Sequence, residues 1–310
     1  MLVPHLLFVR PAAAAGALVI VTASLFATEK VTSTGAPVAN CGDSLRLSWE
    51  PRAPRQGALF RIRVSGSRGI RLTGTLAEQP LHFVDSESDS GGAEAFAAVP
   101  IDAAAESLGL VLRCSTALSR DSIVAQIETA RANYPIDRLT VAPRYGTPPD
   151  SATAARIRRE TERAVAVAVQ AHNTPRLWNE SFVRPRDSRI TSGFGRGREY
   201  NGTITSRHMG TDFAGTTGAP VRAANRGVVR IVDAFYYGGN VVYLDHGAGL
   251  TSAYLHLSQQ SVLVGDTVAR GQVIGRVGAT GRVTGPHLHL IVRYGNITVD
   301  PMSLFELAGG

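Results

Sequence analysis

Five side chains in the last third of the sequence are of types that bind metal ions or move protons. His287 and His289 flank a single leucine in a strand-like stretch, and alternate residues of a strand face the same side. His208 and Asp212 lie four residues apart upstream, and His256 falls in a separate apolar run between them and the pair. Imidazole nitrogens and carboxylate oxygens are common ligands of Zn²⁺. The set therefore indicates a zinc site.

The types and number of these residues fit a catalytic site better than a structural one. A catalytic zinc has three protein ligands and leaves a fourth position to water. His208, Asp212 and one histidine of the 287–289 pair would supply the ligands, and the other histidine of the pair would lie beside the water. His256 would approach from a neighbouring strand. A closed structural site is the alternative, and it would leave one histidine without a role. We interpret His246, at a turn after a strand, as structural.

The elements that must position these residues follow from the pattern of the chain. Residues 45–145 contain short strand-like runs separated by Gly, Pro, Ser and Asp, which predict a β-sandwich whose last strand is "LTVAP" at 139–143. Residues 146–180 predict a helical connector that starts near Asp150 and runs to about 171. Residues 181–308 return to strands punctuated by glycine and hold five of the eight histidines. We therefore predict a mainly β fold with a C-terminal antiparallel β-sheet domain.

The N-terminus has the pattern of a secretory segment. Arg10 precedes an uncharged apolar run over 11–27, with small residues near its end. The run is also close to the lower length limit for spanning a bilayer, so residues 1–27 are either a signal peptide or a membrane anchor. Residues 28–44 are predicted to be a linker. We expect an exported protein that works in the periplasm, in the cell envelope or outside the cell.

The two cysteines agree with export. Cys41 and Cys114 would meet an oxidising compartment, where a pair can form a disulfide. Two buried free thiols are the alternative. No C-x-x-C spacing or second cysteine pair indicates a thiolate metal site.

Composition and charge exclude some classes of function. The chain is 44% hydrophobic and 18% charged, which is ordinary for a globular protein. Its formal charge of +7 comes almost wholly from arginine, since Lys30 is the only lysine. No block of basic residues and no interleaving of basic with aromatic residues marks a nucleic-acid surface. We therefore expect no nucleic-acid partner.

Several longer stretches resemble a known family in the family's order. They are "ITSGFGRGREYNG", "HMGTDFAGTTGAPVRAANRGVV", "YYGGNVVYLDHG", "YLHLS", "GDTVARGQVIGRVGATGRVTGPHLH" and "VDP". Together they cover residues 189–301, which resemble the M23 family of zinc metallopeptidases, the lysostaphin-type or LytM-type peptidoglycan endopeptidases. The first domain is similar, less specifically, to Ig-like β modules that precede such peptidases in exported bacterial proteins.

The resemblance implies a function and a role for each residue. It implies one Zn²⁺ per chain on His208, Asp212 and His289, in a groove lined by antiparallel sheet. It implies that His256 and His287 are active-site residues that do not bind the metal. The implied activity is that of an exported endopeptidase that hydrolyses peptide bonds in peptidoglycan stem peptides or cross-links, either in glycine-rich bridges or at D-alanyl–diaminopimelate. We expect this domain to fold and act without the first one.

Some roles and rival functions stay open at this point. His287 is the candidate general base, and His256 would hold the oxyanion or pass a proton to the leaving amine, but the two roles can be exchanged. Tyr200 either lines the mouth of the groove or packs inside the domain. The main rival function is a non-catalytic wall-binding module that activates another wall hydrolase, and such a module would lack some of the five residues. A D-Ala-D-Ala carboxypeptidase calls for wider His–Asp spacing, and no H-E-x-x-H motif occurs.

Overall fold

The computed structural model describes most of the chain beyond its N-terminal segment. The described residues are 45–86, 91–103, 106–116, 120–141, 148–200, 202 and 204–307. The predicted signal peptide or anchor at 1–27, the predicted linker at 28–44 and Cys41 lie outside these ranges. Within them, no helix combines the length and apolar character that crossing a membrane requires.

The first part of the chain forms the predicted β-sandwich. One sheet consists of β1 (Arg46–Glu50), β2 (Leu59–Ser65), β6 (Ala93–Ala98) and β5 (Val84–Asp85), in that order. The other sheet consists of β4 (Gln79–Leu81), β3 (Arg71–Leu76), β7 (Ser107–Ser115) and β8 (Arg120–Glu128). Alternate residues such as Ile62 and Leu110 fill one core between the two sheets. Cys114, in β7, is disulfide-bonded.

The last strand expected for the sandwich lies elsewhere. Of the run at 139–143, the structure describes residues 139–141, and these add no strand to the sandwich. Strand β9 instead spans Ile136–Leu139 and pairs in parallel with β11 (Gly197–Tyr200), which in turn pairs with β12 (Ile204–Arg207). Each residue of β9 pairs with a residue 61 positions further along the chain, and no local pattern of side chains predicts such a pairing. The segment that follows the sandwich thus adds β9 to a small sheet with strands from the C-terminal part.

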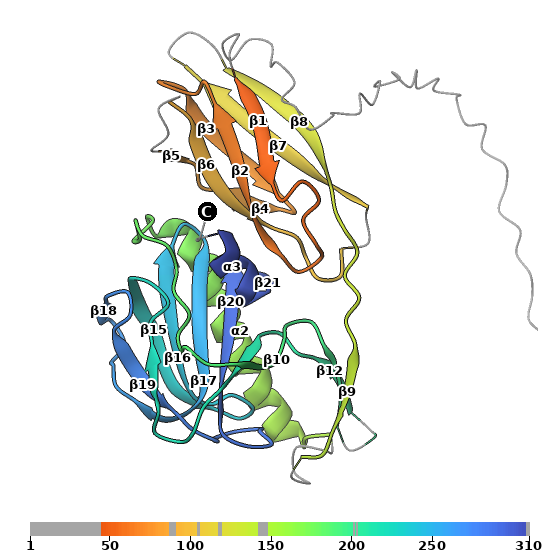
Figure 1. Ribbon diagram of the computed structural model, residues 1–310, viewed down its shortest axis with the longest axis vertical. Helices are drawn as coiled ribbons and strands as arrows, with labels where there is room; N and C mark the ends of the chain where they lie inside the picture. The colour runs from red at the N-terminus through yellow and green to blue at the C-terminus, as the bar shows by residue number, and fades with distance from the viewer. Residues whose placement is uncertain are drawn as a thin grey trace, which may run out of the picture. The chain divides into compact units, whose positions relative to one another are not determined.

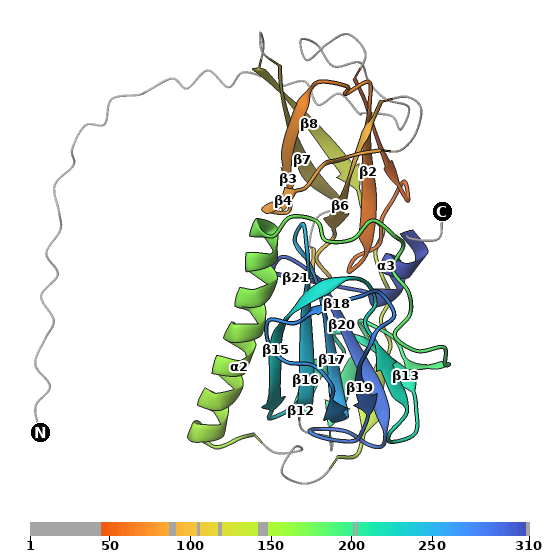
Figure 2. The ribbon, with the colours of Figure 1, turned by 90° about the vertical axis from the view of Figure 1, so that its left-hand side faces the viewer.

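The predicted connector helix is present as α2 (Ser151–Gln170), followed by a short 3₁₀ turn, η1 (Ala171–Asn173). The Asp150 carboxylate caps its N-terminus by accepting the Thr153 N–H at 2.7 Å. Ala164 packs with Ile231 and neighbouring residues on one face of the large sheet, and Figure 2 shows α2 running along that sheet beside β15 and β16. The helix therefore covers a sheet face that would otherwise meet water.

The C-terminal part is built on a ten-stranded sheet. Its main path runs through β10 (Ile190–Ser192), β13 (Thr211–Ala214), β20 (His287–Tyr294), β17 (Leu250–Gln260), β16 (Gly239–Gly247), β15 (Gly227–Phe235) and β18 (Thr267–Val268). Off this path lie β14 (Pro220–Arg222), β19 (Val273–Val277) and β21 (Ile297–Val299), and α3 (Pro301–Leu307) follows. Strands β16, β17 and β20 lie side by side (Figure 1). All pairings in this sheet are antiparallel, as predicted.

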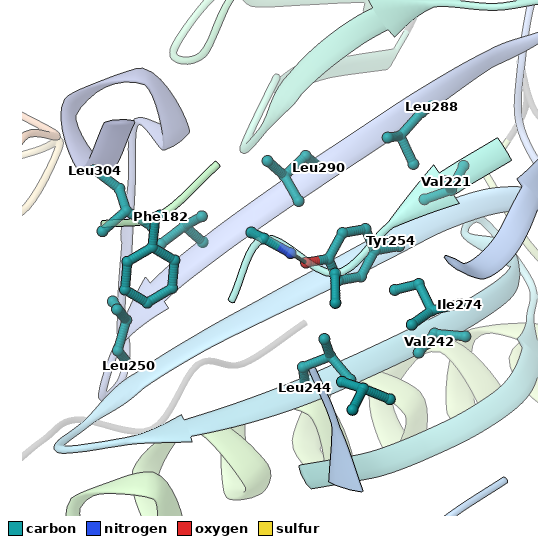
Figure 3. Close-up of a cluster of buried hydrophobic side chains, with 14 of the residues drawn as sticks. Phe182, Val221, Val242, Leu244, Leu250, Tyr254, Ile274, Leu288, Leu290 and Leu304 are labelled. Atoms are coloured by element: carbon teal, nitrogen blue, oxygen red, sulfur yellow. Dashed lines mark hydrogen bonds between the residues drawn. The ribbon is translucent and has the colours of Figure 1, made fainter. Parts of the chain in front are cut away.

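Strand β20 divides its side chains between two environments. Leu288 and Leu290 are fully buried and point into the hydrophobic cluster around Tyr254, as Figure 3 shows. Because alternate residues face opposite sides, His287 and His289 are turned to the other face of the strand. Burial of the two leucines thus fixes the face on which the two imidazoles lie.

Candidate functional site

Pairing between β13 and β20 brings the aspartate to the H-x-H motif. In this antiparallel ladder Asp212 lies opposite His289 and Ala214 lies opposite His287. Directly opposed residues of an antiparallel pair project to the same face. His208 precedes β13 and turns back to the same point. The register of β13 against β20 therefore brings Asp212 close to two histidines that are far from it in the sequence.

Three potential ligand atoms converge at this point. His208 Nε2 lies 3.0 Å from Asp212 Oδ1 and 2.9 Å from His289 Nδ1, and the last two atoms are 2.7 Å apart. All three residues are buried and can hold a metal ion. Tetrahedral Zn²⁺ with bonds of about 2.1 Å separates its ligand atoms by about 3.4 Å. The cluster fits such an ion after the ligand atoms spread by a few tenths of an ångström.

Backbone groups hold His208 in the required orientation. Its Nδ1–H donates to the Gly193 carbonyl at 2.8 Å, and the Ser192 hydroxyl lies 3.2 Å from the same nitrogen. This bond fixes the tautomer that leaves the Nε2 lone pair facing Asp212. The SGFG stretch of the sequence therefore serves to orient a ligand.

A glycine permits the close approach of β13 to β20. A Cβ at Gly210 would lie 2.4 Å from the Leu290 carbonyl oxygen and 2.6 Å from His289 Nε2. Neither neighbour can move without displacing the β20 backbone or a ligand side chain. A side chain at this position would thus disrupt the cluster of His208, Asp212 and His289.

A bulge in β17 directs His256 toward the site. The pairing with β16 shifts between Asn240–Leu257 and Val242–Tyr254, and His256 has φ of +64°. A left-handed conformation at a non-glycine residue costs about 1–3 kcal/mol and is frequent at functional sites. The His256 ring lies 5.0 Å from the His287 ring and 5.8 Å from the His289 ring, between centroids.

His256 and His287 present equivalent nitrogens to the site. His256 Nδ1–H donates to the Thr280 carbonyl at 2.9 Å, and His287 Nδ1–H donates to the Gly285 carbonyl at 2.8 Å. Each ring is therefore left with a basic Nε2. His287 Nε2 lies 3.6 Å from Asp212 Oδ1. Both histidines can accept or return a proton at Nε2.

The titration of the cluster reflects its burial. Burial disfavours the charged form of Asp212, but its side-chain contacts with His208 and His289 outweigh this effect and hold the pKa of the carboxyl well below its usual range. Burial lowers the pKa of His289 to about 4 and that of His256 to about 3. The aspartate is therefore anionic, and the two histidines are neutral, at neutral pH. For Asp212 and His289, these are the protonation states in which a carboxylate and an imidazole can bind a metal ion.

A groove of about 660 Å³ opens onto the cluster. Asp212 and His287 lie in its lining, between β9 and β11 on one side and residues 282–286 on the other. Tyr200 lines this groove and is also 97% buried. It therefore both faces the groove and packs inside the domain, the two roles considered for it from the sequence. The groove therefore gives a peptide access to His287.

Two arginines of the site were not identified from the sequence. Arg198 Nη2 donates to Asp212 Oδ2 at 2.8 Å, and Arg282 lies against two tyrosine rings in the groove. Both occur in stretches that resemble the family, but a single arginine carries no signal of its own in the sequence. Only the tertiary contacts identify them.

His246 lies outside the cluster, as expected for a structural residue. It is fully buried, with Nδ1 2.7 Å from the Arg226 carbonyl and Nε2 2.7 Å from the Ser252 hydroxyl. Both ring nitrogens are thus used inside the domain.

Comparison with known proteins finds a family match for part of the chain. Residues 206–301 match Peptidase family M23. Peptidoglycan DD-endopeptidase ShyB of Vibrio cholerae serotype O1 is 42% identical over 130 residues, which cover 41% of this chain and 30% of that protein. Peptidoglycan DD-endopeptidase ShyA of the same organism is 48% identical over 116 residues, which cover 35% of this chain and 26% of that protein.

A structural relative extends further along the chain. The crystal structure of a candidate peptidase M23 from Pseudomonas aeruginosa has a TM-score of 0.63 and 26% identity, and the match covers 82% of this chain and 96% of that one. The chain spans less than a third of the length of the curated relatives named above. The family match over residues 206–301 includes all five residues.

Proposed function

We propose that this protein is a zinc-dependent endopeptidase that hydrolyses peptide bonds in the stem peptides or cross-links of peptidoglycan. One observation carries the proposal: three ligand atoms lie within 3.0 Å of one another, beside two histidines with free Nε2 atoms. The match to Peptidase family M23 and the similarity to peptidoglycan endopeptidases support it.

His208 Nε2, Asp212 Oδ1 and His289 Nδ1 would hold one Zn²⁺ ion per chain. When bound, the ion supplies a Lewis acid next to the groove. The Gly193 carbonyl keeps His208 in the correct tautomer, and Arg198 orients the second carboxylate oxygen of Asp212. Both contacts prearrange the ligands, so that binding requires little reorganisation.

His287 and His256 would handle the protons of the reaction. His287 Nε2 faces the cluster and can take the proton of the attacking water, because its Nδ1–H is held by Gly285. His256 would act as a donor only after its Nε2 has taken up a proton that comes from the attacking water; it would then hold the developing oxyanion by a hydrogen bond or pass that proton to the leaving amine. The alternative assignment, with His256 as the base and His287 at the oxyanion or leaving amine, uses the same atoms. The cleavage rates of the two single alanine variants distinguish the two assignments.

The rest of the proposal concerns where the protein acts. We propose that residues 1–27 export the chain or anchor it in the membrane, since peptidoglycan lies outside the cytoplasm. We propose that residues 45–145 form an Ig-like domain, that 146–180 form the connector and that 181–308 form the peptidase domain. Export is tested by locating the protein in cell fractions, and cleavage by N-terminal sequencing of the exported form.

Metal analysis and digestion of isolated peptidoglycan test the function. We expect one zinc per chain and release of peptide fragments. Substitution of His208, Asp212 or His289 by alanine should remove most of the zinc, whereas His256→Ala and His287→Ala should keep the zinc and lose activity. Zinc loss in His287→Ala with retention in His289→Ala would reverse the ligand assignment. A zinc-loaded protein that binds peptidoglycan and cleaves none of it would favour the non-catalytic, activating module.

A further inference from the structure

Four arginines line the groove, and three of them have carboxylate partners. These pairs are Arg138 with Glu199 at 3.4 Å, Arg196 with Asp137, and Arg198 with Asp212 at 2.8 Å. Arg282 has no carboxylate partner among the residues that the structure describes. The groove therefore contains one uncompensated guanidinium.

Two aromatic rings hold this guanidinium in place. The Arg282 Cζ atom lies 4.3 Å from the centre of the Tyr200 ring and 4.0 Å from the centre of the Tyr237 ring. Cation–π contacts occupy the flat faces of a guanidinium and leave its N–H groups directed outward in the plane. Such a fork suits a carboxylate, which can accept two parallel hydrogen bonds.

The loop that carries Arg282 is anchored next to the catalytic cluster. The Arg282 backbone N–H donates to the Tyr237 carbonyl at 2.9 Å. A Cβ at Gly281 would lie 2.4 Å from the Gly239 nitrogen, so the loop packs directly on the turn between β15 and β16. Two residues before Arg282, the Thr280 carbonyl accepts the bond that orients His256. Arg282 is therefore a prearranged group within the groove.

We propose that Arg282 binds a free carboxylate of the substrate next to the scissile bond, and that it makes the groove selective for carboxylate-bearing cross-links. This inference rests on the proposed peptidase function. In a direct D-alanyl–diaminopimelate cross-link, the amide nitrogen is attached to a carbon that also bears a carboxylate. A glycine-rich bridge has no such group. The substrate class is thus the direct, anionic cross-link.

Two synthetic cross-linked peptides test the inference. They differ only at that carboxylate, which is free in one and a carboxamide in the other, and the rate of cleavage is measured for zinc-loaded full-length protein. A charge-assisted hydrogen bond to an ionised group corresponds to about 10- to 100-fold in kcat/KM. We expect the wild type to prefer the acid by this factor and Arg282→Gln to reduce the preference to within about threefold.

Arg138→Gln is the matched control. Arg138 lines the same groove, but its side chain is 82% exposed and it has its own partner in Glu199. The substitution removes the same charge, so it reports the general electrostatic effect of the groove on an anionic peptide. We expect Arg138→Gln to keep the preference for the acid, and Arg282→Lys, which keeps the charge without the planar fork, to keep only part of it.

The outcomes separate this inference from the function on which it rests. Equal cleavage of acid and amide by the wild type would overturn the inference and leave the peptidase function standing. Equal losses on both substrates in Arg282→Gln would overturn it as well, because they indicate a structural role. If Arg282→Gln does not fold, the inference is tested by the preference of the wild type for the acid and by the cleavage rates of Arg282→Lys on the two peptides. A zinc-loaded wild type that cleaves neither peptide nor isolated peptidoglycan would overturn both.

Discussion

Protonation of His246 should weaken the C-terminal domain as the pH falls. The imidazole is fully buried, and its nitrogens are 2.7 Å from the Arg226 carbonyl and 2.7 Å from the Ser252 hydroxyl. The carbonyl can only accept, so Nδ1 carries the proton and Nε2 accepts from Ser252. The Tyr254 hydroxyl, 3.0 Å from Ser252, completes the chain of bonds. A second proton on the ring would face the Ser252 hydroxyl and break this arrangement.

The magnitude follows from the pKa of His246. Burial lowers this pKa from 6.5 to about 4, and the bond to Arg226 and the charge of Asp245 offset only part of that effect. Between these values the unfolded chain binds more protons than the folded one, so the free energy of unfolding decreases as the pH falls from about 6.5 to about 4. The full effect is about 3 kcal/mol, and about 2 kcal/mol of it is lost between pH 8 and pH 5.

Urea unfolding of His246→Gln and its parent measures this effect. Trp178 reports the region, because its ring contacts Phe182 at 5.0 Å and Phe182 contacts His246 at 5.2 Å. A Trp49→Phe background removes the other tryptophan, and a chelator in every sample cancels the effect of bound metal. The variant should be less stable at pH 8, and the difference from the parent should shrink by about 2 kcal/mol at pH 5. A difference that stays constant or grows would refute the reasoning.

Three further perturbations have defined expectations. Loss of the disulfide through Cys114→Ala should lower the free energy of unfolding by about 2–5 kcal/mol, measured by thermal or urea unfolding, and thiol titration of the exported parent should find no free thiol. Gly210→Ala should weaken zinc binding in a chelator competition, because its Cβ would lie 2.6 Å from His289 Nε2. Fragments starting at Asn179 and at Arg131 should both bind one zinc, and the longer one, which keeps β9 and α2, should unfold at the higher temperature. Equal unfolding temperatures would contradict this expectation.

The arrangement of the H-x-H motif could be predicted from the sequence because it depends on one local rule. Alternation along a strand puts His287 and His289 on one face, and the burial of Leu288 and Leu290 in the structure confirms this. The strand content, the connector helix and the antiparallel sheet were also predicted from patterns that are local in the sequence. That the histidines and Asp212 meet depends on the register of β13 against β20, which no local pattern predicts. The residue types indicated a shared site without this register, and only the resemblance to a family assigned His289 as the ligand.

Other features of the site had no local pattern to reveal them. The left-handed conformation of His256 arises from a bulge that depends on the pairing of β17 with β16. The contacts of Arg282 join a loop, a strand and a turn that are far apart in the sequence. Each is determined by tertiary packing, which outweighs the intrinsic preferences of single residues.

The position of β9 has a consequence for how the two parts of the chain act together. β9 pairs with β11 along its full length, and Arg196 adds an ion pair to Asp137 of β9. β11 also carries Arg198, which holds the carboxylate of Asp212. Strand β9 therefore forms one wall of the groove, and a displacement of β9 acts on Asp212 through β11 alone. For this reason we expect a fragment without β9 to differ from the full chain in its rate on peptide substrates, even where its zinc content is the same.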